Sequence, residues 1–248
     1  MTQDKNLALE LNNVCVDIPL YSYESTNLKQ LILRPKNLRA NFHRALSNIT
    51  LKLEKGSRTA LIGHNGAGKS TLLRLASGII SHTSGSFEKF TRFEPLIDRS
   101  FLVDDELDAR AASEAYYLLK TGKLRGFEIY LRDILKFANL EKFERYPIKT
   151  YSEGMRTRLQ FALLTSFPSE ALALDETLGA GDAAFIEKAQ IRFRNFLESS
   201  ATLLFASHSE DLLKEFCDRA IVLNNGNIVY QGHIDESLDY YQASRGAN

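Results

Sequence analysis

The sequence predicts an α/β fold with a mainly parallel sheet, and two observations lead to this prediction. Short apolar runs of strand length alternate with longer stretches whose apolar residues recur at helical spacing, which is the order expected of a parallel sheet covered by helices. A glycine-rich loop at residues 63–70 follows one such apolar run and precedes a helical stretch. The 248 residues are enough to bury a sizeable core.

The N-terminal part of the chain predicts strands on both sides of the glycine-rich loop. Apolar and polar residues alternate over residues 7–16 and again over residues 49–53, and each alternation indicates a strand with one buried face. The apolar run at residues 58–62 indicates a fully buried strand before the loop. After the loop, residues 84–86 (Ser-Gly-Ser) predict a turn, and residues 93–97 form a short apolar stretch.

The middle of the chain predicts a helical insert between two halves of the sheet, because apolar residues recur at helical spacing over residues 105–138. The sheet then resumes. Asp182 is placed to cap a long helix, and Asn225-Gly226 is typical of a two-residue hairpin turn. We expect strands at residues 171–174, 202–206, 220–223 and 228–230, and helices at residues 182–198 and up to residue 216.

Composition and charge narrow the functional classes. Lysine and arginine together number 31, as do aspartate and glutamate, so the formal net charge is zero and no nucleic-acid partner is expected. Cys15 and Cys217 are far apart in the sequence, which indicates free thiols in a reducing compartment. No apolar run reaches the length of a signal-peptide core or the roughly 20 residues of a membrane span, so we expect a cytoplasmic protein.

The loop at residues 63–70 fits the pattern Gly, four residues, Gly, Lys, Ser or Thr, which binds nucleoside triphosphates. Its glycines let successive amide groups point at one phosphate chain, and the helix that follows adds the positive end of its dipole. Lys69 is able to reach the β- and γ-phosphates, and Ser70 is able to place its hydroxyl on Mg²⁺. The residues expected to contact ATP here are Gly63, His64, Asn65, Gly66, Ala67, Gly68, Lys69, Ser70 and Thr71.

Polar residues of complementary types follow two further strands. In an α/β sheet, ligand-binding groups gather at the carboxyl ends of the strands. Asp175, at the end of one strand, suits the coordination shell of Mg²⁺, and Glu176 beside it is placed to orient or deprotonate the attacking water. His208, after another strand, is able to donate a hydrogen bond to the γ-phosphate. We therefore predict Glu176 and His208 as catalytic residues.

These motifs, in this order, make the chain resemble the ATPase subunit of an ABC transporter over nearly its whole length. Residues 151–155 (Tyr-Ser-Glu-Gly-Met) stand where that family has its Leu-Ser-Gly-Gly-Gln signature, residues 179–182 match its D-loop, and His208 matches its switch histidine. The resemblance implies a P-loop NTPase of the ABC type with an N-terminal antiparallel β subdomain. It assigns residues 1–97 and 167–248 to the core with this β subdomain, and residues 98–166 to an inserted helical subdomain, within one nucleotide-binding domain.

The resemblance also implies a mechanism and partners. In the family two subunits pair head to tail, so Ser152, Glu153 and Gly154 of one subunit are expected to contact the ATP held by the other. Closure of the homodimer on ATP and its opening after hydrolysis drive transport. The implied partners are integral membrane permease subunits, two with two ATPase subunits, which place this chain peripherally at the cytoplasmic face of the inner membrane.

Within the family, the signature and D-loop regions are most similar to exporters of cell-surface polysaccharide. The run at residues 147–156 is similar to the Tyr-Ser-Xaa-Gly-Met form of that subfamily, and residues 175–182 are similar to its Asp-Glu-Val-Leu-Ala-Val-Gly-Asp run. The implied cargo is a lipid-linked polysaccharide of the O-antigen, capsule or teichoic acid type. The alternatives are another transported cargo, or a soluble ABC ATPase that acts on nucleic acid or ribosomes.

Two family positions have no obvious occupant in this sequence. The family usually offers a glutamine to Mg²⁺ and the attacking water, but no glutamine occurs between Gln30 and Gln160. Asp98 is our assignment for this metal-binding position, with Glu94 as the second choice. The family also stacks an aromatic side chain on adenine. Tyr21 is our assignment on position, and Tyr23 and Phe42 are the alternatives.

Two charged segments allow more than one interpretation. Residues 27–48 contain five basic residues and no acidic residue, which indicates either a solvated basic loop or contact with an anionic surface. The helical insert begins with four acidic residues, which belong either to the surface that couples to the permease or to a solvated helix N-terminus. These acidic residues are Asp104, Asp105, Glu106 and Asp108.

Overall fold

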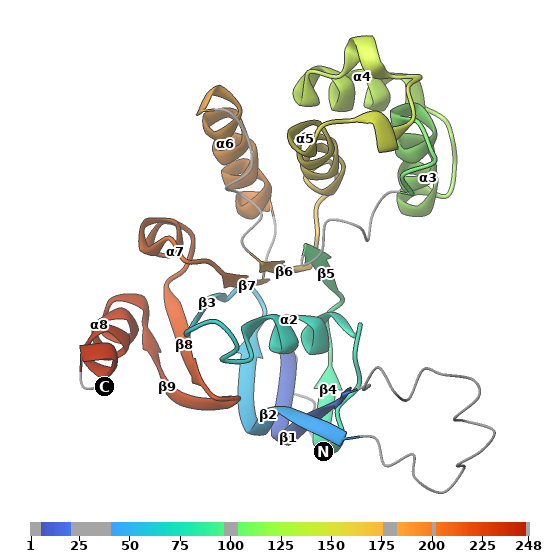
Figure 1. Cartoon of the computed structure of the whole chain (residues 1–248). Helices are drawn as coiled ribbons and strands as arrows, with labels where there is room; N and C mark the ends of the chain where they lie inside the picture. Colours follow the sequence, from blue (N-terminus) through green and yellow to red (C-terminus); the bar gives the residue numbers. More distant parts are fainter. Residues whose placement is uncertain (1–5, 21–40, 97–103, 176–182, 200–201, 247–248) are drawn as a thin grey trace, which may run out of the picture.

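The computed structural model describes residues 6–20, 41–96, 104–175, 183–199 and 202–246, which form two sheets and the helices around them (Figure 1). The strands are β1 (Leu7–Leu20), β2 (Asn41–Glu54), β3 (Arg58–Ile62), β4 (Ser84–Lys89), β5 (Phe93–Leu96), β6 (Ala171–Asp175), β7 (Thr202–Ala206), β8 (Arg219–Asn224) and β9 (Asn227–His233). The helices are α2 (Lys69–Ser77), α3 (Ala109–Thr121), α4 (Phe127–Ala138), α5 (Glu153–Leu164), α6 (Ala183–Ser199), α7 (Glu210–Phe216) and α8 (Ile234–Gly246), with 3-10 turns at Glu141–Phe143 and Ile148–Thr150.

The larger sheet confirms the predicted parallel core. Its six strands lie in the order β5-β6-β7-β3-β8-β9, and every neighbouring pair is parallel except β8 with β9. Strands β3, β6 and β7 are almost wholly buried, as their continuous apolar runs predicted. The predicted hairpin is also present: Asn225 and Gly226 both have positive φ angles, 46° and 76°, which a tight turn between β8 and β9 requires.

The smaller sheet is antiparallel, with the order β2-β1-β4, as predicted for the N-terminal part of the chain. The prediction of a turn at residues 84–86 is wrong, because these residues begin β4 and pair with β1. Gly85 has a φ of 91°, and a Cβ atom there would lie 2.4 Å from the carbonyl oxygen of Asn13. The glycine therefore marks a β-bulge where two backbones approach closely, and not a chain reversal.

Helices α3, α4 and α5 form a group that stands apart from both sheets (Figure 1). The helical pattern predicted over residues 105–138 is confirmed as two helices, and Gly122 ends the first of them in the left-handed conformation. Helix α8 was not predicted. It packs only a narrow apolar stripe that includes Ile234 and Leu238, both almost fully buried, so its sequence carries a weak helical period.

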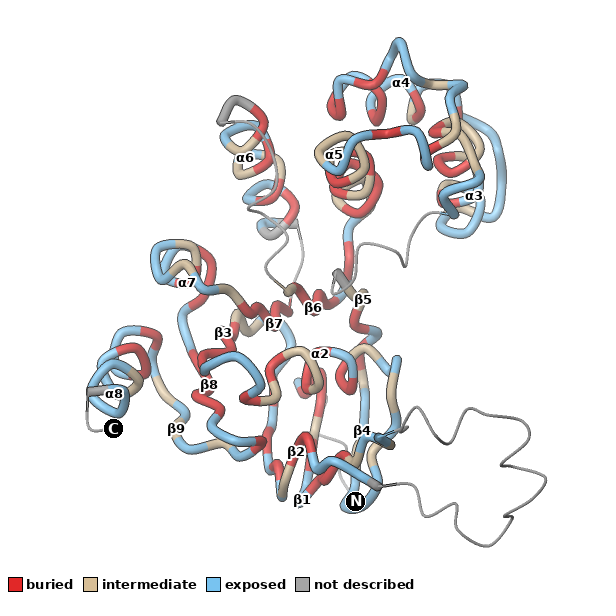
Figure 2. Tube along the Cα trace, viewed as in Figure 1, coloured by how far each residue is buried: buried red, intermediate tan, exposed pale blue. Residues whose placement is uncertain are grey.

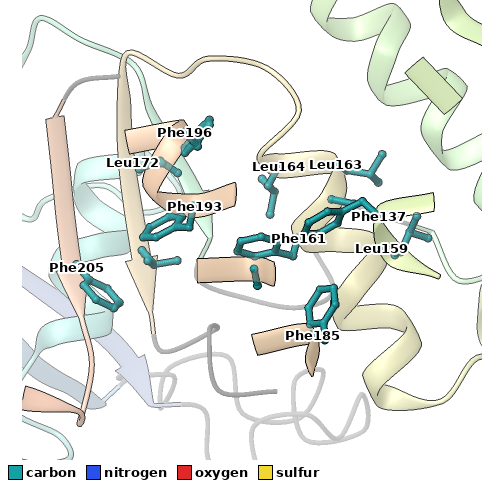
Figure 3. Close-up of a cluster of buried hydrophobic side chains, with 14 of the residues drawn as sticks. Phe137, Leu159, Phe161, Leu163, Leu164, Leu172, Phe185, Phe193, Phe196 and Phe205 are labelled. Atoms are coloured by element: carbon teal, nitrogen blue, oxygen red, sulfur yellow. The ribbon is translucent and has the colours of Figure 1, made fainter. Parts of the chain in front are cut away.

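Aromatic side chains join the helix group to the six-stranded sheet (Figure 3). Figure 2 shows buried positions on α5 and along β6 and β7. Phe161 of α5 lies between Phe137 of α4 and Phe193 of α6, with ring centroids 6.0 and 6.3 Å away. Phe193 in turn lies 5.0 Å from Phe216 of α7. The same buried cluster includes apolar residues of β6 and β7. One continuous core therefore runs from the helix group to the sheet.

Replacing Phe193 with alanine should destabilise the whole fold, because its side chain is 1% exposed and central to this cluster. We expect Phe193→Ala to lower the free energy of unfolding by about 3–5 kcal/mol, the usual cost of deleting a buried phenylalanine. Ile191 lies on the same helix and is 56% exposed, so Ile191→Ala is the matched control and should change stability by less than about 0.5 kcal/mol. Urea denaturation followed by circular dichroism measures both values, and similar losses would contradict the central position of Phe193.

Candidate nucleotide-binding site

The glycine-rich loop connects β3 to α2, as its sequence predicted. Gly68 is the N-cap of α2 and has a φ of 108°, a conformation that favours glycine. A Cβ atom on Gly68 would lie 2.9 Å from Leu46 Cδ2 and 3.0 Å from the carbonyl oxygen of Ala45, so close packing also favours glycine here. The first backbone N–H groups of α2 follow this cap directly. They supply the donors and the positive dipole end that an anionic phosphate needs.

Lys69 is a buried cation at the centre of the loop. Its side chain lies across the loop backbone, where Nζ donates hydrogen bonds to the carbonyl oxygens of Gly63 (2.6 Å) and His64 (3.1 Å). The residue is only 9% exposed. A positive charge held at low exposure beside helix N–H groups is complementary to a phosphate chain. The donor set of the loop therefore fits the triphosphate of ATP.

Ser70 and Asp175 are brought together from positions 105 residues apart in the chain. The hydroxyl of Ser70, in the first turn of α2, donates a 2.6 Å hydrogen bond to Oδ2 of Asp175 at the end of β6. A hydroxyl and a carboxylate side by side at the edge of a phosphate loop are the hard oxygen ligands that Mg²⁺ takes. Their chemistry fits the predicted metal site.

The β8–β9 hairpin supports the loop from the other side, which the sequence did not reveal. The backbone N–H of Gly226 donates to the carbonyl of Ala67 (3.0 Å), and the carbonyl of Gly226 accepts from the N–H of Ser47 on β2 (2.8 Å). His64 and Asn224 are also joined, with Nε2 and Oδ1 3.1 Å apart. The Asn225-Gly226 turn was recognised as a hairpin, but its contact with the loop depends on strand order, which local sequence does not encode.

The remaining predicted residues lie in different places. His208 follows β7 and is exposed, at the same sheet edge as the ends of β3 and β6. Ser152 is the N-cap of α5, where its Oγ accepts from the N–H of Met155 at 3.3 Å. Ser152, Glu153 and Gly154 belong to the helix group and so stand apart from the loop (Figure 1). The structure of one chain thus separates the signature from the phosphate loop.

Several predicted residues lie outside the described part of the chain. These are Tyr21, Tyr23, Asp98, Glu176 and the D-loop at residues 179–182 with Asp182. Two alternatives are described. Glu94 forms an ion pair with Lys120 of α3, and Phe42 lies on β2 with 63% of its surface exposed. Most of the basic segment at residues 27–48 is also outside the described residues.

Comparison with known proteins identifies the family. Residues 46–179, more than half of the chain, match the family described as ABC transporter. The chain belongs to the ABC transporter family. Two solved structures support the same fold. The first is an ATP-binding cassette in a dimeric post-hydrolysis state with ADP and Pi, which has a TM-score of 0.72 and 18% identity over 91% of this chain and 98% of that chain. The second is the ATP-binding subunit of an ABC transporter, which has a TM-score of 0.72 and 19% identity over 95% of this chain and 93% of that chain.

Curated ATP-binding proteins of export systems align with nearly the whole chain. An O-antigen export system ATP-binding protein of Yersinia enterocolitica, RfbE, is 36% identical over 92% of this chain and 98% of its own length. Its counterpart RfbB of Klebsiella pneumoniae is 32% identical over 94% and 97%. A teichoic acids export ATP-binding protein of Bacillus anthracis, TagH, is 31% identical over 95% of this chain, but the match spans 42% of that longer relative.

The chain is an ABC-type ATPase, so its phosphate loop is an ATP-binding loop. Its fold is the predicted ABC type, with a mainly parallel sheet, an antiparallel sheet and a group of helices. Among the described residues, no helix combines the length and the apolar character needed to cross a membrane.

Replacing Gly63 with alanine should weaken ATP binding, because a Cβ atom there would lie 2.5 Å from the carbonyl oxygen of Leu223. The loop must move away from the hairpin to relieve this contact. We expect the affinity for a fluorescent ATP analogue to fall by about tenfold or more, equivalent to about 1.4 kcal/mol.

Gly122→Ala is the control for this experiment. It also introduces a side chain at a positive φ (70°), but it lies at the end of α3, where no atom comes within 4 Å of the new Cβ. It should reduce thermal stability and leave ATP affinity unchanged. Equal nucleotide affinities for the two variants would contradict the role of the Gly63 contact.

Proposed function

We propose that this chain is the ATP-hydrolysing subunit of an ABC transporter that exports a lipid-linked cell-surface polysaccharide of the O-antigen, capsule or teichoic acid type. The observation that carries this proposal is the alignment with an O-antigen export subunit over 92% of this chain and 98% of that relative. A match of this extent includes the signature and the helix group. It is therefore more specific than a match to the phosphate loop alone, because many unrelated ATPases share that loop.

The described residues support a specific binding arrangement for ATP and its metal. Lys69, which lies across the loop, and the N–H groups at the start of α2 would bind the phosphates, while Ser70 and Asp175, which are hydrogen-bonded to each other, would hold Mg²⁺. When bound, the metal would neutralise charge that develops on the phosphate oxygens. Asp98 is proposed as an additional metal ligand, and Tyr21 as the side chain that stacks on adenine.

Two residues at the carboxyl ends of strands are proposed to act on the γ-phosphate. Glu176 follows the metal ligand Asp175 directly, and we assign it to orient the attacking water and accept its proton. His208 follows β7 at the same edge of the sheet, and we assign it to donate a hydrogen bond to the γ-phosphate. The parallel pairing of β6 with β7 supports this arrangement because it brings both strand ends to one edge.

The proposed working state is a homodimer in which each ATP lies between two subunits. Two observations support it. The signature residues Ser152, Glu153 and Gly154 stand apart from the phosphate loop of their own chain, and an ATP-binding cassette of the same fold forms a dimer with ADP and Pi. Ser152 and Gly154, at the N-terminus of α5, would face the γ-phosphate held by the second subunit.

The proposed partners are two integral membrane permease subunits, with the ATPase dimer bound peripherally at the cytoplasmic face of the inner membrane. The names of the aligned relatives, which are ATP-binding proteins of export systems, support this arrangement. The cargo would be a polysaccharide attached to a lipid carrier.

Replacing Glu176 with glutamine should separate ATP binding from hydrolysis. Glutamine keeps the size of the side chain but does not accept the proton of the attacking water. We expect Glu176→Gln to bind ATP normally and to lose turnover by about 10²- to 10⁴-fold, the range for a general base. A phosphate-release assay and an ATP-binding titration measure the two quantities. Hydrolysis at a near-normal rate would remove Glu176 from this role.

Purification of the tagged chain from detergent-solubilised membranes tests the transport function. We expect a multi-span membrane protein to co-purify in equal amount, because the ATPase dimer must bind a permease to drive export. Mass spectrometry identifies the proteins that co-purify. The same purification with the Lys69→Ala variant shows whether recovery of the membrane protein depends on nucleotide binding. Recovery of ribosomes or nucleic acid without a membrane protein would contradict the proposal.

A further inference from the structure

The acidic residues that begin the helix group have partners within the chain. Asp108 caps α3 by accepting a 2.7 Å hydrogen bond from the N–H of Ala111. Glu106 accepts a 2.7 Å hydrogen bond from Lys149 Nζ, and Asp105 accepts a 3.0 Å hydrogen bond from Arg156. Two of these carboxylates thus bind the segment around the signature.

The backbones of the same two segments also pair. The N–H of Lys149 donates to the carbonyl of Asp105, and the N–H of Ile148 donates to the carbonyl of Leu107, both at 2.8 Å. Ile148 is buried, so this pairing is anchored in the core. Residues 104–108 therefore lie alongside residues 147–149, immediately before the signature.

Tyr151, which precedes the N-cap Ser152 of α5, is anchored within the helix group. Its hydroxyl donates a 2.6 Å hydrogen bond to the carbonyl of Phe143, and the residue is only 5% exposed. Burial raises the pKa of Tyr151 to about 12, which extends the pH range over which the phenol keeps its proton and donates this hydrogen bond.

Arg156 connects the paired segments to the first turns of α5. One guanidinium nitrogen donates to Asp105 Oδ2 and the other donates to the carbonyl of Lys149, each at 3.0 Å. Its backbone N–H donates to the carbonyl of Ser152, also at 3.0 Å. A planar guanidinium is able to make both side-chain contacts at once in a fixed geometry, which a lysine ammonium on a flexible stem does not reproduce.

The N-terminal end of α5 is accessible. Ser152 and Glu153 are exposed, and a Cβ atom on Gly154 would meet no atom within 4 Å. The first turn of α5 is therefore held through Arg156, while Ser152 and Glu153 at its N-terminal end are exposed.

We propose that Arg156, held by Asp105 and by the carbonyl of Lys149, is a positioning residue that fixes the start of α5 so that Ser152 and Gly154 meet the nucleotide of a second subunit. This inference rests on the proposed homodimer. Arg156 acts through the signature and does not itself touch ATP. Its contribution is to orientation, since exposed ion pairs contribute at most about 1 kcal/mol to stability.

The test measures three quantities for each variant: ATP affinity of the single chain, thermal midpoint, and ATP turnover of the complex purified from membranes. We expect Arg156→Gln to lower turnover between about 10- and 100-fold, the effect of misplacing a catalytic contact by about 1 Å. ATP affinity should stay unchanged and the thermal midpoint should move by less than about 4 °C. Arg156→Lys should recover part of the turnover.

Asp105→Asn should have a similar effect, and combining it with Arg156→Gln should add little, because both variants break one contact. Arg145→Gln is the matched control, because the Arg145 side chain is 69% exposed and its ion pair with Glu144 is long, at 3.7 Å. Turnover of Arg156→Gln equal to that of Arg145→Gln would overturn the positioning role. A fall in ATP affinity or stability large enough to account for the lost turnover would also overturn it.

Ser152→Ala separates this inference from the proposed function. If Ser152→Ala lowers turnover and Arg156→Gln does not, the signature acts as proposed and the positioning role of Arg156 is wrong. If Ser152→Ala leaves turnover unchanged, the contact of the signature with a second subunit's nucleotide is wrong, and the inference fails with it.

Discussion

The parallel register of three central strands determines where the phosphate site forms. Asp175 at the end of β6 pairs with Ala206 at the end of β7, and Ala206 pairs with Leu61 near the end of β3. The three strands therefore end at one level, and the Ser70 hydroxyl meets the Asp175 carboxylate across the edge they share. A slip of one residue in β6 would turn Asp175 to the other face of the sheet.

The phosphate loop and the helix group are held in the molecule by different kinds of contact. Backbone hydrogen bonds and short polar contacts fix the phosphate loop on the sheet, so its geometry is specified residue by residue. The helix group joins the sheet through a cluster of aromatic rings, of which Phe161, Phe185 and Phe193 are central (Figure 3). Side chains of α6 add hydrogen bonds to the helix group, such as those of Arg192 to Thr165 and Asp133. Apolar packing is not directional, so these hydrogen bonds, and not the aromatic rings, fix the orientation of the junction. The signature is on the part of the molecule held in this second way.

The sequence predicted the parts of the structure whose signals are local. The phosphate loop, the buried strands and the Asn225-Gly226 turn each depend on residues within a few positions of one another. The position of Asp175 at the site also followed, since carboxyl ends of parallel strands meet at one edge. The glycine at position 85 was misread because a bulge and a turn both select glycine, and only the partner strand distinguishes them. The contacts of Asn224 with His64 and of Arg156 with Asp105 join residues 160 and 51 positions apart, which no local pattern encodes.

The β8–β9 turn shows how a surface feature becomes part of a binding site. Turns between antiparallel strands are commonly the places where related proteins gain or lose residues, because nothing packs against them. Here Gly226 lies between β2 and the phosphate loop, with backbone hydrogen bonds to both. A Cβ atom on it would lie 2.7 Å from the carbonyl oxygen of Ala45. The composition of this turn is thus constrained by β2 and the phosphate loop as well as by the strands it connects. Loop grafting or tag insertion in this protein should leave residues 225–226 intact, although they are at the tip of a hairpin.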